Sequence, residues 1–155
     1  MVAVIGILMV VGMPTFLTYW RTSTLKAGAQ ELVSLLNQAK QIAIKENETV
    51  CARTDTGTGT YGTKLRYMRG SCAAASTCTA TGNVSPCIWT GAGSDGSGYF
   101  TLSNRIEANA TANVSFSYLG AASPSGSYTV RVIDNPSGTA TVTVAGSGRI
   151  SYSFP

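Results

Sequence analysis

The first thirteen residues, MVAVIGILMVVGM, carry no charged side chain. Pro14 interrupts the apolar run, and the aromatic pair Tyr19-Trp20 then precedes Arg21. This order is typical of a membrane segment that meets its interface. The stretch reaches the ~20 residues of a span only when it is counted to Trp20. It lacks the charged start and the cleavage site of a signal peptide. The alternative is that this stretch is a buried core helix. A head of this size would then have too little chain to bury it.

Residues 22–46 change in character without a break. Apolar side chains recur at helical spacing at Leu25, Ala29, Leu32, Leu35, Leu36, Ala39, Ile42 and Ala43. This spacing predicts a helix with one face packed on a sheet, and Asn47 is positioned to stop it. A single helix from Val2 to Glu46 would be about 65–70 Å long at ~1.5 Å per residue. We expect Pro14 to kink or locally melt it, since proline removes a backbone hydrogen bond and clashes with the preceding turn.

From Thr49 onward, short alternating segments separated by Gly-, Ser- and Thr-rich turns predict strands. We expect strands at 49–54, 62–69, 99–102, 112–119, 127–133, 139–144 and 149–154. The segment 134–138 predicts a hairpin turn, and 70–98 predicts an irregular loop held by cysteines. One long helix followed by strands indicates an α+β fold. In it the second half of the helix packs on an antiparallel sheet and the apolar first half does not.

Composition narrows the range of functions. The 155 residues form one domain, with 44% hydrophobic residues, 12% charged residues and a net charge of +4. The charged share is about half of the usual value. There is no histidine, which excludes Ser-His-Asp and Cys-His catalysis and histidine–zinc sites. The seven acidic residues show no spacing that pairs two of them across a cleft. We therefore expect no enzyme, no metal site and no cofactor.

The four cysteines are Cys51, Cys72, Cys78 and Cys87. Their spacing fits poorly to the two close pairs of a zinc site. With an apolar leading segment and a polar, weakly charged head, they favour two disulfides formed in an oxidising compartment. Four cysteines allow three pairings, and the sequence does not choose among them.

Several segments resemble a known family. VAVIGILMVVGMPTF followed by a long helix is similar to the N-terminus of type IV pilins and type II secretion pseudopilins. LVSLLNQAKQIAIKENETVCAR resembles the GspH/FimT-type minor pilins, in which a short strand after the helix often holds a cysteine, here Cys51. The closing segment resembles that branch in a Phe-then-Gly stretch, Phe116 and Gly120, and in the pair Gly148-Arg149. The resemblance leaves residues 55–110 unmatched.

The sequence departs from this family in two places. Aligning Gly6 and Pro14 with the family's apolar helix leaves the chain beginning inside that helix. The family's cleavage site, N-methylated first residue and glutamate therefore have no counterpart, and we expect them to lie upstream of Met1. Some FimT-type relatives resemble DNA binders that use a glycine–arginine–any–arginine motif. Here the motif reads Gly148-Arg149-Ile150-Ser151, without the second arginine.

Lys64, Arg66 and Arg69 form the densest basic cluster. Strand alternation puts Lys64 and Arg66 on one face and Arg69 on the other. The cluster predicts contact with a phosphate backbone. The competing interpretation is a charged strand edge that discourages pairing with another edge. The candidate DNA contacts are Lys64, Arg66, Arg69, Arg131 and Arg149.

The resemblance implies a structural subunit. We expect residues 1–21 to form a transmembrane or filament-core helix, and residues 22–155 a globular head with a helix at 22–46 and strands in 49–155. The side chains expected in the membrane or filament core are Val4, Ile5, Ile7, Leu8, Val10, Val11, Pro14 and Phe16. Expected partners are sister pilin subunits, the inner-membrane assembly machinery and, before assembly, membrane lipid. The chain would cross the bacterial inner membrane once, with its head periplasmic or extracellular. The alternatives are a DNA-binding minor pilin for DNA uptake and a major pilin that forms the filament itself.

Overall fold

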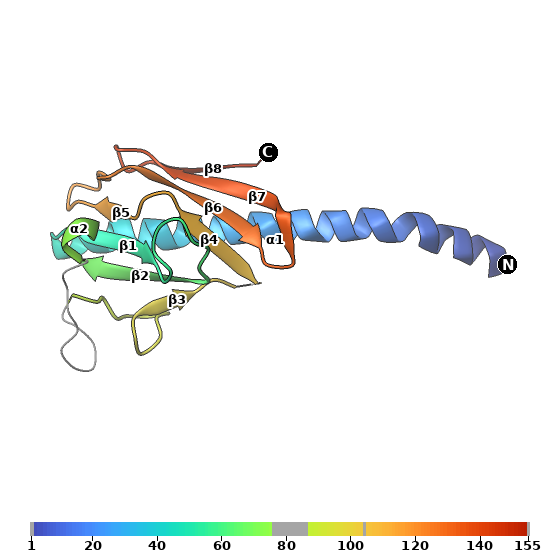
Figure 1. The fold of residues 1–155 in the computed structure, drawn as a ribbon, viewed down its shortest axis with the longest axis horizontal. Helices are drawn as coiled ribbons and strands as arrows, with labels where there is room; N and C mark the ends of the chain where they lie inside the picture. Colours follow the sequence, from blue (N-terminus) through green and yellow to red (C-terminus); the bar gives the residue numbers. More distant parts are fainter. Residues whose placement is uncertain (1, 76–86, 104, 155) are drawn as a thin grey trace.

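The computed structural model describes residues 2–75, 87–103 and 105–154, with residues 2–17, 74 and 75 described by their backbone alone. A long helix, α1 (Val2–Glu46), is followed by a head of two four-stranded antiparallel sheets. The first sheet has the order β3 (Tyr99–Thr101), β2 (Lys64–Arg69), β1 (Val50–Thr54), β5 (Val114–Phe116). The second has the order β4 (Ile106–Ala110), β6 (Gly126–Val132), β7 (Asn135–Val144), β8 (Ile150–Ser153). The short α2 (Cys72–Ala75) follows β2. The second half of α1 lies against the sheets, and its first half extends beyond the head (Figure 1).

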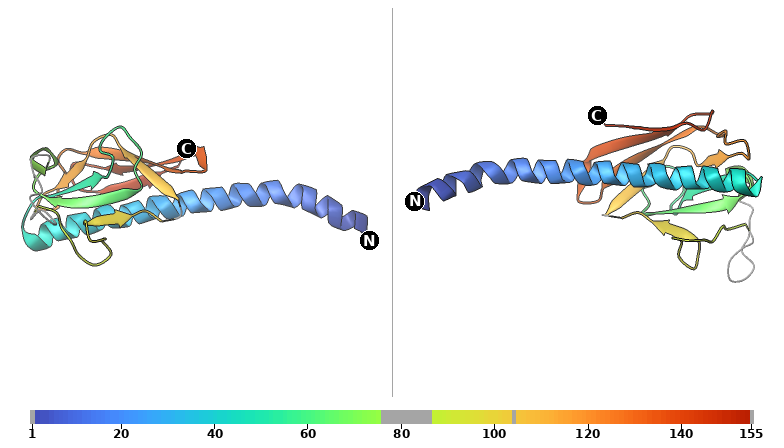
Figure 2. Two further views of the ribbon diagram at one scale, coloured as in Figure 1. Left: turned by 60° about the horizontal axis from the view of Figure 1, so that its bottom comes forward. Right: turned by 180° about the vertical axis from the view of Figure 1, so that it is seen from behind.

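The helix predicted from Val2 to Glu46 is confirmed. It runs without a break through Pro14, so the expected local melting does not occur, and its free part only curves (Figure 2). Helical turns on both sides of a proline can accommodate one lost hydrogen bond by bending. The helix ends as predicted at Asn47, which has a positive φ of 53°. The N–H of Glu48 then donates to the carbonyl of Ala43 at 3.1 Å, a left-handed cap that satisfies a terminal carbonyl.

One core joins the helix to both sheets. The predicted stripe from Leu25 to Ala43 is buried, with Leu35 only partly so. Two buried tyrosines fasten the layers together. The hydroxyl of Tyr67 donates to the carbonyl of Leu35 at 2.7 Å, and that of Tyr128 donates to the carbonyl of Ala52 at 3.3 Å. Burial raises the pKa of both tyrosines, so they remain neutral donors at physiological pH.

The head differs from the sequence prediction in its number of sheets. It has two sheets where one was expected, and the sequence pattern did not predict β4. The inward residues of β4 after Ile106 are Ala108 and Ala110, whose small side chains give a weak hydrophobic alternation. The predicted strand 112–119 shortens to β5, because the N–H of Ser117 donates to the carbonyl of Ala121 and closes a turn. Within the described residues of the predicted loop 70–98, the short helix α2 is the one named element.

The hairpin between β6 and β7 turns earlier than predicted. Its turn is at Ile133-Asp134, where Val132 pairs with Asn135, and not over 134–138. The register shifts between Arg131 and Val132, so that β7 carries extra residues, including Pro136. Proline has no N–H to give to the ladder and is tolerated at such an irregularity.

Candidate functional site

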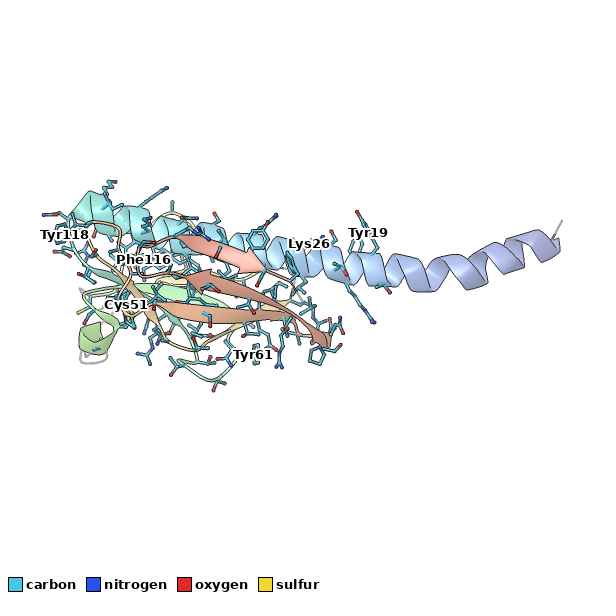
Figure 3. All side chains as sticks on the ribbon, turned by 90° about the horizontal axis from the view of Figure 1, so that it is seen from above. Tyr19, Lys26, Cys51, Tyr61, Phe116 and Tyr118 are labelled. Atoms are coloured by element: carbon cyan, nitrogen blue, oxygen red, sulfur yellow. A yellow bond between two sulfur atoms is a disulfide. The ribbon has the colours of Figure 1, made fainter. Side chains whose placement is uncertain are left out.

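The first half of α1 extends beyond the head (Figure 1). Among the helix side chains that the structure describes, Leu25 is the first in the core, whereas Tyr19 and Trp20 are 73% and 64% exposed. Tyr19 projects from the helix outside the head, at the opposite end of the head from Tyr118 (Figure 3). In the part of the chain that the structure describes, no helix is long and apolar enough to cross a membrane. The expected membrane or filament-core side chains, Val4 to Phe16, lie outside the described side chains.

Gly120 and Gly148, two of the residues that carry the family resemblance in the closing segment, meet against α1. A Cβ added to Gly148 would overlap the carbonyl oxygen of Gly120, so the two turns touch through their backbones. Lys40 of α1 completes this contact: its Nζ donates to the carbonyl of Gly148 at 3.0 Å. A Cβ at Gly120 would lie 2.8 Å from Cε of Lys40. The arrangement holds the β7–β8 turn, and with it the exposed Arg149, against the helix.

A disulfide fixes the start of α2. Cys51 of β1 is bonded to Cys72, which decides one of the pairings that the sequence left open. Cys51 is fully buried beside Met68, and the N–H of Cys72 donates to Oγ of Ser115 at 2.7 Å. Cys87 is also disulfide-bonded, and Cys78 lies outside the described residues.

Lys64 and Arg66 share one face of β2, as alternation predicted, and the structure places both beside Tyr99. Nζ of Lys64 and Cζ of Arg66 lie 5.6 Å and 4.9 Å from the centre of the Tyr99 ring. Nζ of Lys64 also lies 3.9 Å from Asp95. The pKa of Asp95 is lowered, first by the hydrogen bond from the N–H of Tyr99, then by that from Ser97 and by the charge of Lys64. This acidic partner reduces the positive potential that a phosphate backbone would meet.

Arg69 lies on the other face of β2, next to the end of α1. Its Nη2 is 3.2 Å from Glu46. The same carboxylate accepts a hydrogen bond from Nε1 of Trp89 at 3.1 Å. Arg69 therefore fastens the helix end to the first sheet, which explains its position without any external ligand.

Arg131 and Arg149 lie on the second sheet. Arg131 forms an ion pair with Glu107 and stacks 3.5 Å from the ring centre of Tyr61. Arg149 is exposed in the β7–β8 turn. Of the five predicted DNA contacts, three have a carboxylate partner: Lys64, Arg69 and Arg131.

Lys40 and Glu46 also have structural roles, although the sequence does not single them out. Their partners Gly148 and Arg69 are far away along the chain, and no local pattern indicates such contacts. The described residues contain no group of three or more His, Cys, Asp or Glu side chains that could hold a metal ion.

The family model described as type II transport protein GspH matches residues 28–148 of this chain. No protein of curated function matches the sequence. The fold is similar to the type IV minor pilin FimU of Pseudomonas aeruginosa, with 14% identity and a TM-score of 0.55 over 83% of this chain and 92% of that chain. It is also similar to the minor pseudopilin EpsH of the type 2 secretion system of Vibrio cholerae, with 14% identity and a TM-score of 0.55 over 84% of this chain and 97% of that chain. These likenesses confirm the expected pilin-like α+β fold.

Proposed function

Because the chain belongs to the GspH family of type II transport proteins, we propose that it is a minor pilin or pseudopilin that assembles with other subunits into a filament. Pilins and pseudopilins are structural subunits, and this chain is not an enzyme. Its own contribution would be a helix that packs among sister helices and a head that faces outward. Similar folds come from both a type IV pilus and a secretion system, so the proposal covers either filament.

The observation that carries the proposal is the division of α1. Its second half supplies the core of the head, whereas its first half extends beyond it (Figure 1). Burying a large apolar side chain stabilises by about 1.5–3 kcal/mol, and the first half carries a run of them. Lipid before assembly and sister helices in a filament would both bury that run. We therefore propose residues 1–21 as the membrane or filament-core segment and residues 22–155 as the head. The core side chains would be Val4, Ile5, Ile7, Leu8, Val10, Val11, Pro14 and Phe16.

Before assembly, the subunit would be held by this helix in the bacterial inner membrane, with its head in the periplasm. The Cys51–Cys72 disulfide supports an oxidising location for the head, because such bonds persist outside the cytosol. Assembly machinery in the same membrane would then move the subunit into the filament.

Expression of the head alone, starting at Leu25, tests this proposal against the full chain. The head should be soluble and monomeric, whereas the full chain should need detergent. A matched full-length control with Ile7→Lys and Val11→Lys keeps the helix length but adds charge, and should need less detergent. A full-length parent that is monomeric without detergent in sedimentation experiments would refute the membrane and filament-core roles together.

DNA binding stays a prediction for this chain. Arg149 is exposed at the family's basic-motif position, but its second arginine is missing and Lys64 already has an acidic partner. If the chain binds DNA, its affinity should fall as the salt concentration rises. The logarithm of the binding constant should fall by about 0.9 per phosphate contact for each unit of log salt concentration. Fluorescence anisotropy with labelled duplex DNA measures it. Binding lost on Arg149→Gln or Lys64→Gln/Arg66→Gln would support the alternative, and absence of binding at low salt would end it.

The major-pilin alternative differs in abundance and not in chemistry. A major pilin would dominate filaments sheared from the cell surface. A minor pilin or pseudopilin would be a trace component of the same preparation, as quantitative mass spectrometry can measure.

A further inference from the structure

A cleft lies beside α1 where the helix leaves the head. Thr18, Arg21, Thr22 and Leu25 line it from the helix, and Asn135 and Ser137 line it from the β6–β7 hairpin. The helix residues follow the spacing that puts them on one face. The hairpin reaches over this face (Figure 1). The cleft has a volume of about 240 Å³, below the ~300–1,000 Å³ of pockets for drug-sized ligands, so it suits a compact group.

The cleft holds two groups of hydrogen-bond donors, the guanidinium of Arg21 and the side-chain amide of Asn135. Arg21 is exposed and has no carboxylate within ion-pair distance among the described residues. Asp134, at the tip of the same hairpin, is paired with Arg105 at 2.9 Å. Oδ1 of Asn135 accepts from the hydroxyl of Ser137 at 2.9 Å, which leaves the Nδ2 donors of Asn135 available. A guanidinium and an amide N–H₂ are both donors only, so together they fit an anion with several oxygen acceptors.

The surroundings indicate which anion this is. Tyr19 and Trp20 precede Arg21 directly and are largely exposed. In membrane proteins such aromatic side chains lie at the depth of the lipid headgroups. Arg21 follows Trp20 by one residue, about 1.5 Å along the helix axis. Ile133, at the hairpin tip, is 40% exposed and adds an apolar contact at the same end of the head.

We propose that this cleft binds the phosphate diester of an anionic phospholipid headgroup while the subunit waits in the membrane. The inference rests on the proposed membrane-held state and adds a defined lipid contact to it. Arg21 donates to the phosphate oxygens, and Asn135 donates from the hairpin. The bound headgroup sets the rotation of the head about the helix axis, because it engages one face of α1 and one hairpin. Movement into a filament requires this contact to be released.

Vesicle binding and native mass spectrometry of the full chain test the proposal. The protein is transferred from detergent to vesicles of phosphatidylcholine alone or with phosphatidylglycerol. Lipid retained on the protein is counted after release, and inorganic phosphate is added as competitor in a separate arm. The variants are Arg21→Gln, Asn135→Ala and the matched control Arg149→Gln, which removes an exposed arginine at the turn contacted by Lys40.

We expect the parent to retain phosphatidylglycerol about fivefold better than Arg21→Gln, the ratio expected for one basic residue near an anionic surface. Asn135→Ala should lower retention as well, and Arg149→Gln should not. Equal retention by parent and Arg21→Gln overturns the proposal. An equal loss in Arg149→Gln also overturns it, because the attraction would then be a property of net charge.

Further outcomes distinguish a failure of the headgroup site from a failure of the proposed membrane-held state. Displacement of the lipid by millimolar inorganic phosphate would make the cleft a free-phosphate site and overturn the headgroup assignment. Association with phosphatidylcholine vesicles, together with retention of phosphatidylglycerol that does not depend on Arg21, would leave membrane holding intact while the headgroup site fails. Absence of association with any vesicle would refute the proposed membrane-held state itself.

Discussion

Replacing Gly148 by alanine should disrupt the contact between the turn at Gly120 and the β7–β8 turn. Gly148 has a φ of 75°, a conformation that costs an L-residue ~1–2 kcal/mol. The new Cβ would also overlap the carbonyl oxygen of Gly120. That oxygen belongs to the backbone and has no rotamer by which to move away, so we add the ~1–3 kcal/mol typical of overpacking. The expected loss in the free energy of unfolding is about 2–5 kcal/mol.

Gly59→Ala is the matched control for this substitution. Gly59 has a similar φ of 82°, but a Cβ there would meet nothing within 4 Å. It should therefore cost only the ~1–2 kcal/mol of backbone conformation. Urea unfolding in constant detergent measures both variants in a Trp20→Phe background, which leaves Trp89 as the one tryptophan of the chain. With m-values of ~1–3 kcal/mol/M, Gly148→Ala should lower the midpoint by roughly 1 M or more. Equal losses for the two variants would refute a structural role for the contact between the turns.

Lys40 provides an independent check of the same contact. Lys40→Met keeps the aliphatic stem but removes the hydrogen bond to the carbonyl of Gly148. Hydrogen bonds to charged groups contribute ~1.5–3 kcal/mol. If Lys40 and the two turns form one unit, the double variant Lys40→Met/Gly148→Ala should lose less than the sum of the single losses. Additive losses would show that Lys40 acts separately.

Three further predictions concern other parts of the head. Gly28→Ala adds a Cβ 2.5 Å from both Cγ1 and Cδ1 of Ile106. The gain in helix propensity of ~1 kcal/mol is outweighed by overpacking of ~1–3 kcal/mol, so thermal unfolding should show a lower midpoint. The loss should be smaller in an Ile106→Ala background, because that change removes both overlapping atoms. Replacing Cys51 and Cys72 by alanine opens a loop of sequence separation 21 and should cost about 3 kcal/mol; a stability equal to the parent's would contradict this. Asp95→Asn should destabilise most at neutral pH, because the folded pKa of Asp95 lies below its ordinary value of 3.8. Its contribution is present above pH 3.8 and is lost as the pH falls through the folded pKa, so urea midpoints of parent and variant should converge only in acid.

Local patterns in the sequence are enough to predict several of the elements. The spacing of apolar residues from Leu25 to Ala43 predicted the buried stripe of α1, and Asn47 predicted its end, because helical periodicity and capping depend on residues a few positions apart. Alternation predicted most strands for the same reason, and it placed Lys64 and Arg66 on one face of β2. It failed at β4, where alanines carry the inward positions.

Only the tertiary structure decided which elements meet. The Cys51–Cys72 pairing and the contact of Lys40 with Gly148 join residues 21 and 108 positions apart. The division into two sheets depends in the same way on which strands of the whole chain pair. The same holds for the carboxylate partners of Arg69 and Arg131, which are Glu46 and Glu107. Such contacts follow from how the whole chain closes around one core, and no segment carries that information alone. The cleft at Arg21 is of the same kind, because its two walls come from the helix and from a hairpin more than a hundred residues later.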